Sequence, residues 1–298
     1  MKALIKLLIV TLALSSFSCA LSSKSESEDG VDSQANEKSS AKVSPVVTAG
    51  TAQAQLKKSM EQDGLRPIDT ESKPTSKNLS DKLNDAIKSQ NDDLINSVAT
   101  EVLTQNSKDA KALNALAMVH FKRSHLEAAA YLLNKAILAS PQNSELFNNL
   151  GLVKLAQDEM REAIQAFRKG LEVNTQDAIL GANLGSLYLA EKDYQKAELA
   201  LEIPFKKGTK DSKILNNYAI ALAANGKATK AADLYEKLLK ENPGQRDLMF
   251  NYSVTLIKHL QKYKEGLDIL NRLKFVGAPS EVKNVIKDLE SIAKAGLK

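Results

Sequence analysis

Residues 144–177 read SELFNNLGLVKLAQDEMREAIQAFRKGLEVNTQD, and their pattern of small and large residues recurs along the chain. Matching segments begin with AKALNALA at Ala110, AILGANLG at Ala178 and SKILNNYA at Ser212, so the pattern has a constant period of 34. Two sets of small residues keep the same step: Ala117, Gly151, Gly185 and Ala219, and Ala129, Ala163, Ala197 and Ala231. A fixed period of this length is typical of proteins built from stacked repeats.

Each unit is predicted to contain two helices, as in 144–157 and 161–172, because each segment carries an apolar stripe at helical spacing. The small residues Gly151 and Ala163 allow the two helices to approach closely. A larger residue there would overpack the crossing at a cost of about 1–3 kcal/mol. A single pair cannot bury its own apolar faces, so neighbouring pairs must stack.

The pattern resembles the tetratricopeptide repeat family. The resemblance rests on the small residues above, on large residues in the second helices and on residues that end the units: Leu133, Phe167, Leu201 and Tyr235, and Pro141, Thr175, Thr209 and Pro243. It implies an all-α fold, a right-handed superhelix of stacked helix-turn-helix units with a C-terminal capping helix. In this family the first helices of the units line the concave face.

The repeat divides the chain into a degenerate N-terminal unit at 76–109, five units at 110–143, 144–177, 178–211, 212–245 and 246–279, and a capping helix at 280–298. In the fifth unit the second helix comes one residue late, which predicts an extra residue in the turn at 260–264. Pro204 lies inside a predicted helix, where it should end or kink that helix at Ile203.

The N-terminus resembles a bacterial lipoprotein signal. Residues 1–18 combine Lys2 and Lys6 with the apolar run LLIVTLAL and small residues, as in a secretory signal peptide. Cys19 stands where such a signal is cut and acylated, and Ala20 behind it implies sorting to the outer membrane, facing the periplasm. Ser16 departs from the usual Leu, so ordinary cleavage and an unanchored secreted protein stay open. Residues 19–75 are too poor in large apolar residues to fold and are predicted to be a disordered tether.

Composition and motifs argue against catalysis. The 298 residues include 43% hydrophobic residues, a single Cys and no Trp, which excludes an internal disulfide framework and a Cys-based zinc site. The three histidines lack partners at metal-ligand spacing, and no catalytic or phosphate-binding motif occurs. The net charge of +5 comes from scattered basic residues without an aromatic platform, so nucleic-acid binding is not expected. We predict a non-enzyme without cofactor or metal.

The candidate site is a groove along the first helices. Four asparagines recur there in phase, followed by a floor one turn on: Asn149, Asn183, Asn217 and Asn251, then Leu152, Ser186, Ile220 and Val254. A side-chain amide can donate to and accept from the backbone of an extended peptide. The column resembles the asparagine ladders with which some tetratricopeptide proteins hold peptides, although asparagine is also the family's common residue at this place.

The leading functional hypothesis is a lipid-anchored scaffold of the bacterial envelope that binds a segment of another envelope protein in this groove. A sharper version, by analogy alone, is a pilotin-like lipoprotein for assembly of an outer-membrane pore. The rival class is an accessory to a catalytic neighbour, or a hidden enzyme.

Overall fold

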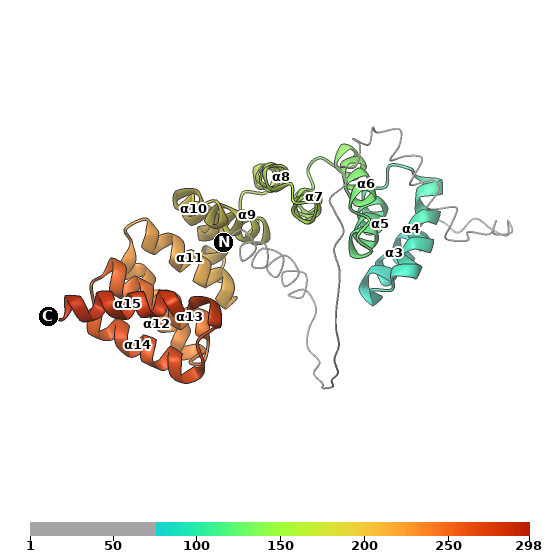
Figure 1. Ribbon diagram of the computed structural model, residues 1–298. Helices are drawn as coiled ribbons and strands as arrows, with labels where there is room; N and C mark the ends of the chain where they lie inside the picture. Colours follow the sequence, from blue (N-terminus) through green and yellow to red (C-terminus); the bar gives the residue numbers. More distant parts are fainter. Residues whose placement is uncertain (1–75) are drawn as a thin grey trace, which may run out of the picture. The chain divides into compact units, whose positions relative to one another are not determined.

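The computed structural model describes residues 76–298, and this part of the chain contains helices and no strand (Figure 1). The prediction of an all-α repeat fold is confirmed. The expected signal peptide, Cys19 and the tether lie outside the described residues. The described part forms two compact units, an N-terminal unit of residues 76–159 and a C-terminal unit of residues 160–298.

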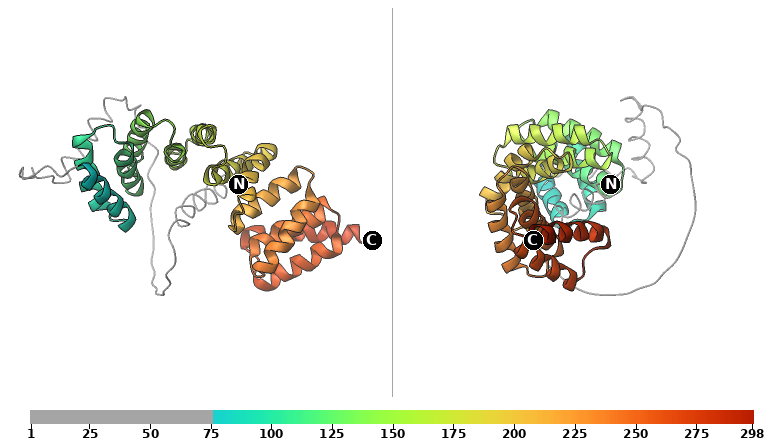
Figure 2. Two further views of the ribbon diagram at one scale, coloured as in Figure 1. Left: turned by 180° about the vertical axis from the view of Figure 1, so that it is seen from behind. Right: turned by 60° about the vertical axis from the view of Figure 1, so that its left-hand side comes forward.

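The N-terminal unit is a run of helices in which each packs against the next (Figure 2). They are α3 (Ser76–Ser89), α4 (Asp92–Gln105), α5 (Ala110–Lys122), α6 (Leu126–Ala139) and α7 (Ser144–Ala156). Its core contains fully buried side chains such as Leu83, Leu113 and Leu133. Small residues at 0% exposure, Ala117 and Ala129 among them, let α5 and α6 approach closely.

The C-terminal unit repeats the arrangement. It contains α8 (Met160–Val173), α9 (Ala178–Ala190), α10 (Tyr194–Lys206), α11 (Ser212–Ala224), α12 (Ala228–Glu241), α13 (Arg246–Val254), the π-helical turn η2 (Thr255–His259), α14 (Tyr263–Val276), the short η3 (Ser280–Val282) and α15 (Lys283–Gly296). The first helices α9, α11 and α13 contact one another in order, so one continuous face runs across them.

The period of the repeat has a local physical basis in the turns between helices. One residue with positive φ sits in the turn that joins the two helices of a pair, and it recurs at a constant step: Gln90, Ser124, Asp158, Lys192 and Gly226. Acidic N-caps keep the same register, since Asp177 and Asp211 accept hydrogen bonds from the first backbone N–H groups of α9 and α11. Fixed caps and fixed turns hold each helix pair to the same length.

The fifth unit departs from this period earlier than predicted. The N–H of Leu260 donates to the carbonyl of Thr255 at 3.1 Å, which closes a π-helical turn at the end of the first helix. The positive-φ residue that follows, Gln261, comes one position later than a full period after Gly226. The extra residue is therefore absorbed by η2, and its predicted place in the turn at 260–264 is wrong. A π-turn accommodates one residue without breaking the helix.

Pro204 does not end its helix. α10 continues to Lys206, past the predicted end at Ile203, and the N–H of Lys207 still donates to the carbonyl of Ile203. Pro204 is buried, and its ring packs where Gly181 of α9 has no side chain. The expected stop is wrong because the neighbouring helix makes room for the proline ring.

The last helix, α15, covers the end of the C-terminal unit. Ile286, Leu289 and Ala293 are buried, and the backbone of Gly296 lies against the ring of Tyr263. Val285 and Ile292, which the sequence pattern places on the same apolar stripe, stay 39% and 42% exposed. The helix thus buries one narrow strip and leaves the rest to solvent.

Candidate partner-binding face

The predicted groove residues fall into two groups. Asn149 and Leu152 lie on α7 of the N-terminal unit and are only 8% and 7% exposed. The others lie on the contacting helices α9, α11 and α13 of the C-terminal unit: Asn183 and Ser186, Asn217 and Ile220, and Asn251 and Val254. The C-terminal group is the more accessible, because all six residues are half-buried.

The asparagine amides join neighbouring first helices. Asn217 donates through Nδ2 to Oγ of Ser186 at 3.1 Å, and Asn251 donates to Oδ1 of Asn216 at 2.9 Å. Asn149 makes the same kind of bond within the N-terminal unit, to Oδ1 of Asn114 at 2.9 Å. Each bond uses one of the two amide N–H groups and fixes the orientation of the side chain.

This orientation leaves ligand-binding capacity at Asn217 and Asn251. Each keeps a second N–H and a carbonyl oxygen, which is one donor and one acceptor for the backbone of another chain. An amide already held in place loses little conformational freedom when a ligand binds.

Sequence reasoning missed two apolar residues on this face. Phe250 lies one helical turn before Val254 and is half-buried, and Ile179 at the start of α9 is 59% exposed. The repeat could have found both, since Phe250 stands one period after Asn216 and Ile179 stands one period before Lys213. We define the first-helix face by eight residues: Ile179, Asn183, Ser186, Asn217, Ile220, Phe250, Asn251 and Val254.

The charge bordering the first-helix face is positive. Lys213 near the start of α11 and Lys258 in η2 are both exposed, whereas Asp247 is the acidic residue at the place of Lys213 in the next unit. Exposed ammonium groups attract a partner that carries carboxylates, mainly by steering its approach.

A separate hollow of about 430 Å³ lies over α12, α13 and α14. Tyr252 and Leu256 are among its lining residues, and its charged side chains have both signs: Glu236, Glu265 and Asp268 with Lys240 and Arg272. Burial, and then the charge of Glu236, raise the pKa of Tyr252 to about 12, so its hydroxyl stays neutral at physiological pH. The mixed charges give this hollow no clear selectivity for cation or anion.

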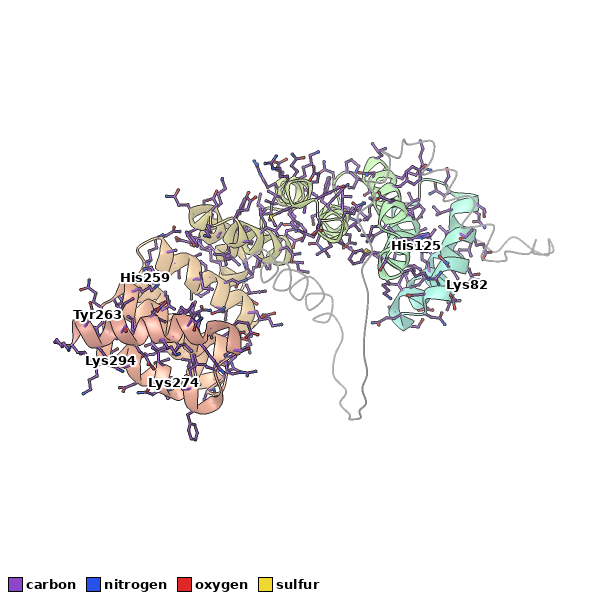
Figure 3. All side chains as sticks on the ribbon, in the orientation of Figure 1. Lys82, His125, His259, Tyr263, Lys274 and Lys294 are labelled. Atoms are coloured by element: carbon purple, nitrogen blue, oxygen red, sulfur yellow. The ribbon has the colours of Figure 1, made fainter. Side chains whose placement is uncertain are left out.

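Reactive groups are sparse in the described part of the chain. Residues 76–298 contain no cluster of three or more His, Cys, Asp or Glu side chains able to hold a metal ion. None of the described helices has the length and apolar character needed to cross a membrane. Two histidines come into contact, since the Nδ1 atoms of His120 and His125 lie 3.4 Å apart, with His125 at the turn between α5 and α6 (Figure 3).

Comparison with known families agrees with this architecture. The family model for the tetratricopeptide repeat matches residues 148–203 and 210–280. Residues 148–203 and 210–280 are tetratricopeptide repeats. Tetratricopeptide repeats are typically non-catalytic scaffolds that bind peptides or other proteins. No curated protein matches the sequence.

Several solved tetratricopeptide structures are similar. YrrB, a tetratricopeptide protein with an unusual peptide-binding site, has a TM-score of 0.59 at 19% identity, over 66% of this chain and 97% of its own. A double mutant of MamA has a TM-score of 0.51 at 15% identity, over 56% of this chain and 93% of its own. PilF of Pseudomonas aeruginosa has a TM-score of 0.47 at 20% identity, over 63% of this chain and 90% of its own. At these identities the likeness concerns the fold alone.

Proposed function

We propose that the chain is a non-catalytic interaction scaffold, which binds an extended segment of another protein along the first-helix face of α9, α11 and α13. The observation that carries the proposal is a pair of hydrogen bonds, which the side-chain amides of Asn217 and Asn251 donate to the preceding first helices. These bonds hold two amides in a fixed orientation on a face where Ile220, Phe250 and Val254 remain half-buried.

The chemistry of this face suits a peptide. Apolar side chains of the segment would cover Ile220, Phe250 and Val254, and about 25 cal/mol is gained for each Å² of apolar surface removed from water. The amides would pair with backbone groups without regard to sequence. YrrB, which shares the fold, is a tetratricopeptide protein with a peptide-binding site. The exposed Lys213 and Lys258 favour a segment that carries acidic residues.

A paired set of variants tests this proposal. Ile220→Ser with Val254→Ser removes apolar surface from the first-helix face, whereas Leu199→Ser with Phe275→Ser removes it from side chains that are 69% and 94% exposed outside that face. In co-purification from the native host, the first double variant loses its partner and the control keeps it. Equal recovery of the same partner by both would contradict the proposal, and circular dichroism verifies that both remain folded.

We also propose that the scaffold is anchored in the bacterial envelope through an acylated Cys19, which faces it toward the periplasm. The support is the sequence around Cys19 alone, a signal-like segment followed by Cys-Ala. Cys19→Ala should move the protein from the membrane fraction to the soluble fraction. An unchanged distribution would exclude the anchor, and a wild-type protein found in the soluble fraction would favour an unanchored adaptor.

A further inference from the structure

One side of the last helix carries a row of exposed lysines. Three of them lie on α15 and the fourth lies in the turn that follows: Lys283, Lys287, Lys294 and Lys298. In a helix of 3.6 residues per turn, this spacing places all four within about 60° of one another around the axis. We call these four residues the lysine row, and at the rise of an α-helix it extends over about 22 Å.

The lysine row has an electrostatic cost that contacts within the described part do not offset. Lys283 and Lys287 stand one turn apart, where like charges repel each other. Lys283 is also the first residue of α15, where the helix macrodipole disfavours a positive charge. Lys206 and Lys262 pair with carboxylates three or four residues away, but within residues 76–298 no lysine of the row forms an ion pair. The charge of the row is therefore free to act on a partner.

The end of α14 joins this row and keeps it positive. Glu290 is the acidic residue that stands one turn from both Lys287 and Lys294 on α15. Its carboxylate pairs with Lys274 of α14, with Nζ and Oε1 2.5 Å apart, so that its charge is already neutralised. Lys274 and Lys294 can be followed in Figure 3, on the two neighbouring helices.

A large apolar side chain lies next to this ion pair. Phe275, which follows Lys274 in the chain, is 94% exposed, and Val276 after it is 44% exposed. A phenyl ring in water loses the free energy that burial would give it. Lysines together with an exposed phenylalanine are typical of surfaces that lie in the headgroup region of a membrane.

The type of cation favours a lipid surface over an acidic protein. Arginine binds a carboxylate through a rigid fork of donors, whereas lysine is a point charge on a flexible stem. The row consists of lysines alone. Flexible point charges spread along a helix suit a surface of diffuse negative charge, and anionic headgroups provide one. The same surface offers Phe275 an apolar layer beneath the headgroups.

We propose that the lysine row and Phe275 dock the C-terminal unit on a membrane surface that contains anionic lipids. This surface is separate from the first-helix face. It also requires no acyl chain, so it is independent of the anchor proposed at Cys19, although the two would reinforce each other.

Co-sedimentation with lipid vesicles tests the proposal. The parent is the chain from residue 19 onward, which keeps every described helix, with Cys19→Ser so that neither an acyl chain nor the signal-like segment contributes. The vesicles contain phosphatidylglycerol and phosphatidylcholine in equal amounts, or phosphatidylcholine alone. We expect the parent to bind the first kind only, and to be released when salt is raised to about 0.5 M.

Two triple variants of equal charge separate the lysine row from net charge. Lys287→Gln, Lys294→Gln and Lys298→Gln should together lower the partition coefficient about 100-fold, since each lysine near an anionic surface contributes about fivefold. The control carries Lys230→Gln, Lys237→Gln and Lys240→Gln, three exposed residues of α12, and should bind as the parent does. Circular dichroism verifies that both variants are folded.

A second pair of variants tests the phenyl ring. Phe275→Ser should lower the partition coefficient at least about fivefold, whereas Leu199→Ser, at a side chain that is 69% exposed on α10, should not change it. Equal partition of these two variants would overturn the role of Phe275.

Four results would overturn the proposal as a whole: no binding of the parent to the anionic vesicles, equal binding to both kinds of vesicle, parent-like binding of the α15 triple variant, or an equal loss in both triple variants. Binding of the parent to poly-glutamate but not to vesicles is one form of the first result. It would assign the lysine row to an acidic protein instead.

Discussion

The ring of Pro204 in α10 packs against the backbone of Gly181 in α9. A Cβ atom on Gly181 would lie 3.1 Å from Cδ of Pro204 and 2.7 Å from the carbonyl oxygen of Ala200. That carbonyl is the one left without its helical donor, because proline has no N–H. At the place of Gly181 the other units carry large residues: Leu113, Phe147, Leu215 and Met249. The glycine and the proline therefore depend on each other.

Gly181→Ala should destabilise the protein. The added methyl group would overlap a backbone oxygen that cannot move alone, at a cost of about 1–3 kcal/mol. Alanine regains about 1 kcal/mol of helix propensity. The free energy of unfolding in urea should fall by up to about 2 kcal/mol. Gly244→Ala is the matched control, because nothing lies within 4 Å of its added Cβ, and it should change stability by less than about 0.5 kcal/mol.

The bond between Asn251 and Asn216 should appear as a coupling energy. A double-mutant cycle of Asn251→Ala and Asn216→Ala is expected to give about 0.5–1.5 kcal/mol, the usual net value of one hydrogen bond. The control cycle combines Asn251→Ala with Asn225→Ala, whose amide binds the carbonyl of Tyr194 instead. Additive effects in the first cycle would show that the hydrogen bond between Asn251 and Asn216 does not contribute to stability.

Acid should weaken the hydrogen bonds that join Glu198 of α10 to Asn225 and Lys227, in the turn between α11 and α12. Burial alone would raise the pKa of Glu198, but hydrogen bonds from Lys227 and Asn225 outweigh it and lower this pKa below its ordinary value. A lowered pKa in the folded state contributes stability that is present above the unfolded pKa, about 4.3, and is lost as the pH falls through the folded one.

Glu198→Gln should accordingly cost about 1 kcal/mol at pH 7 and progressively less below about pH 4.3. Thermal unfolding from pH 7 to pH 3 measures this difference. Glu202→Gln is the control, since Glu202 joins Lys206 in an exposed pair on one helix, and it should cost less stability at pH 7 than Glu198→Gln does. A difference for Glu198→Gln that stays constant with pH would contradict the assignment.

The sequence predicts most of the fold because local rules and packing agree in the regular repeats. α7 and α8 begin and end close to the predicted 144–157 and 161–172. Prediction failed where a contact with another helix overrides a local rule. Proline is a reliable helix breaker by itself, but Gly181, on the preceding helix, decides what Pro204 does.

The candidate site was predictable only in part, because contacts between helices also decide which atoms its side chains meet. Periodicity alone places Asn217 and Asn251 on the first helices, but not the atoms to which they donate, which depend on how adjacent helices are offset. The contact of His120 with His125 also escaped, because side chains at this spacing come together only across a turn. The available signal was the opposite charge of Lys154 and Glu159, which stand at the same two places in the next repeat.

Site-specific photo-cross-linking in intact cells tests the binding of a partner on the first-helix face most directly. A cross-linking residue replaces Ile220 on that face, or Leu199, which is 69% exposed on α10. We expect a discrete adduct with another protein from position 220 and none from position 199. Adducts from position 199 alone, or the same adducts from both positions, would contradict it.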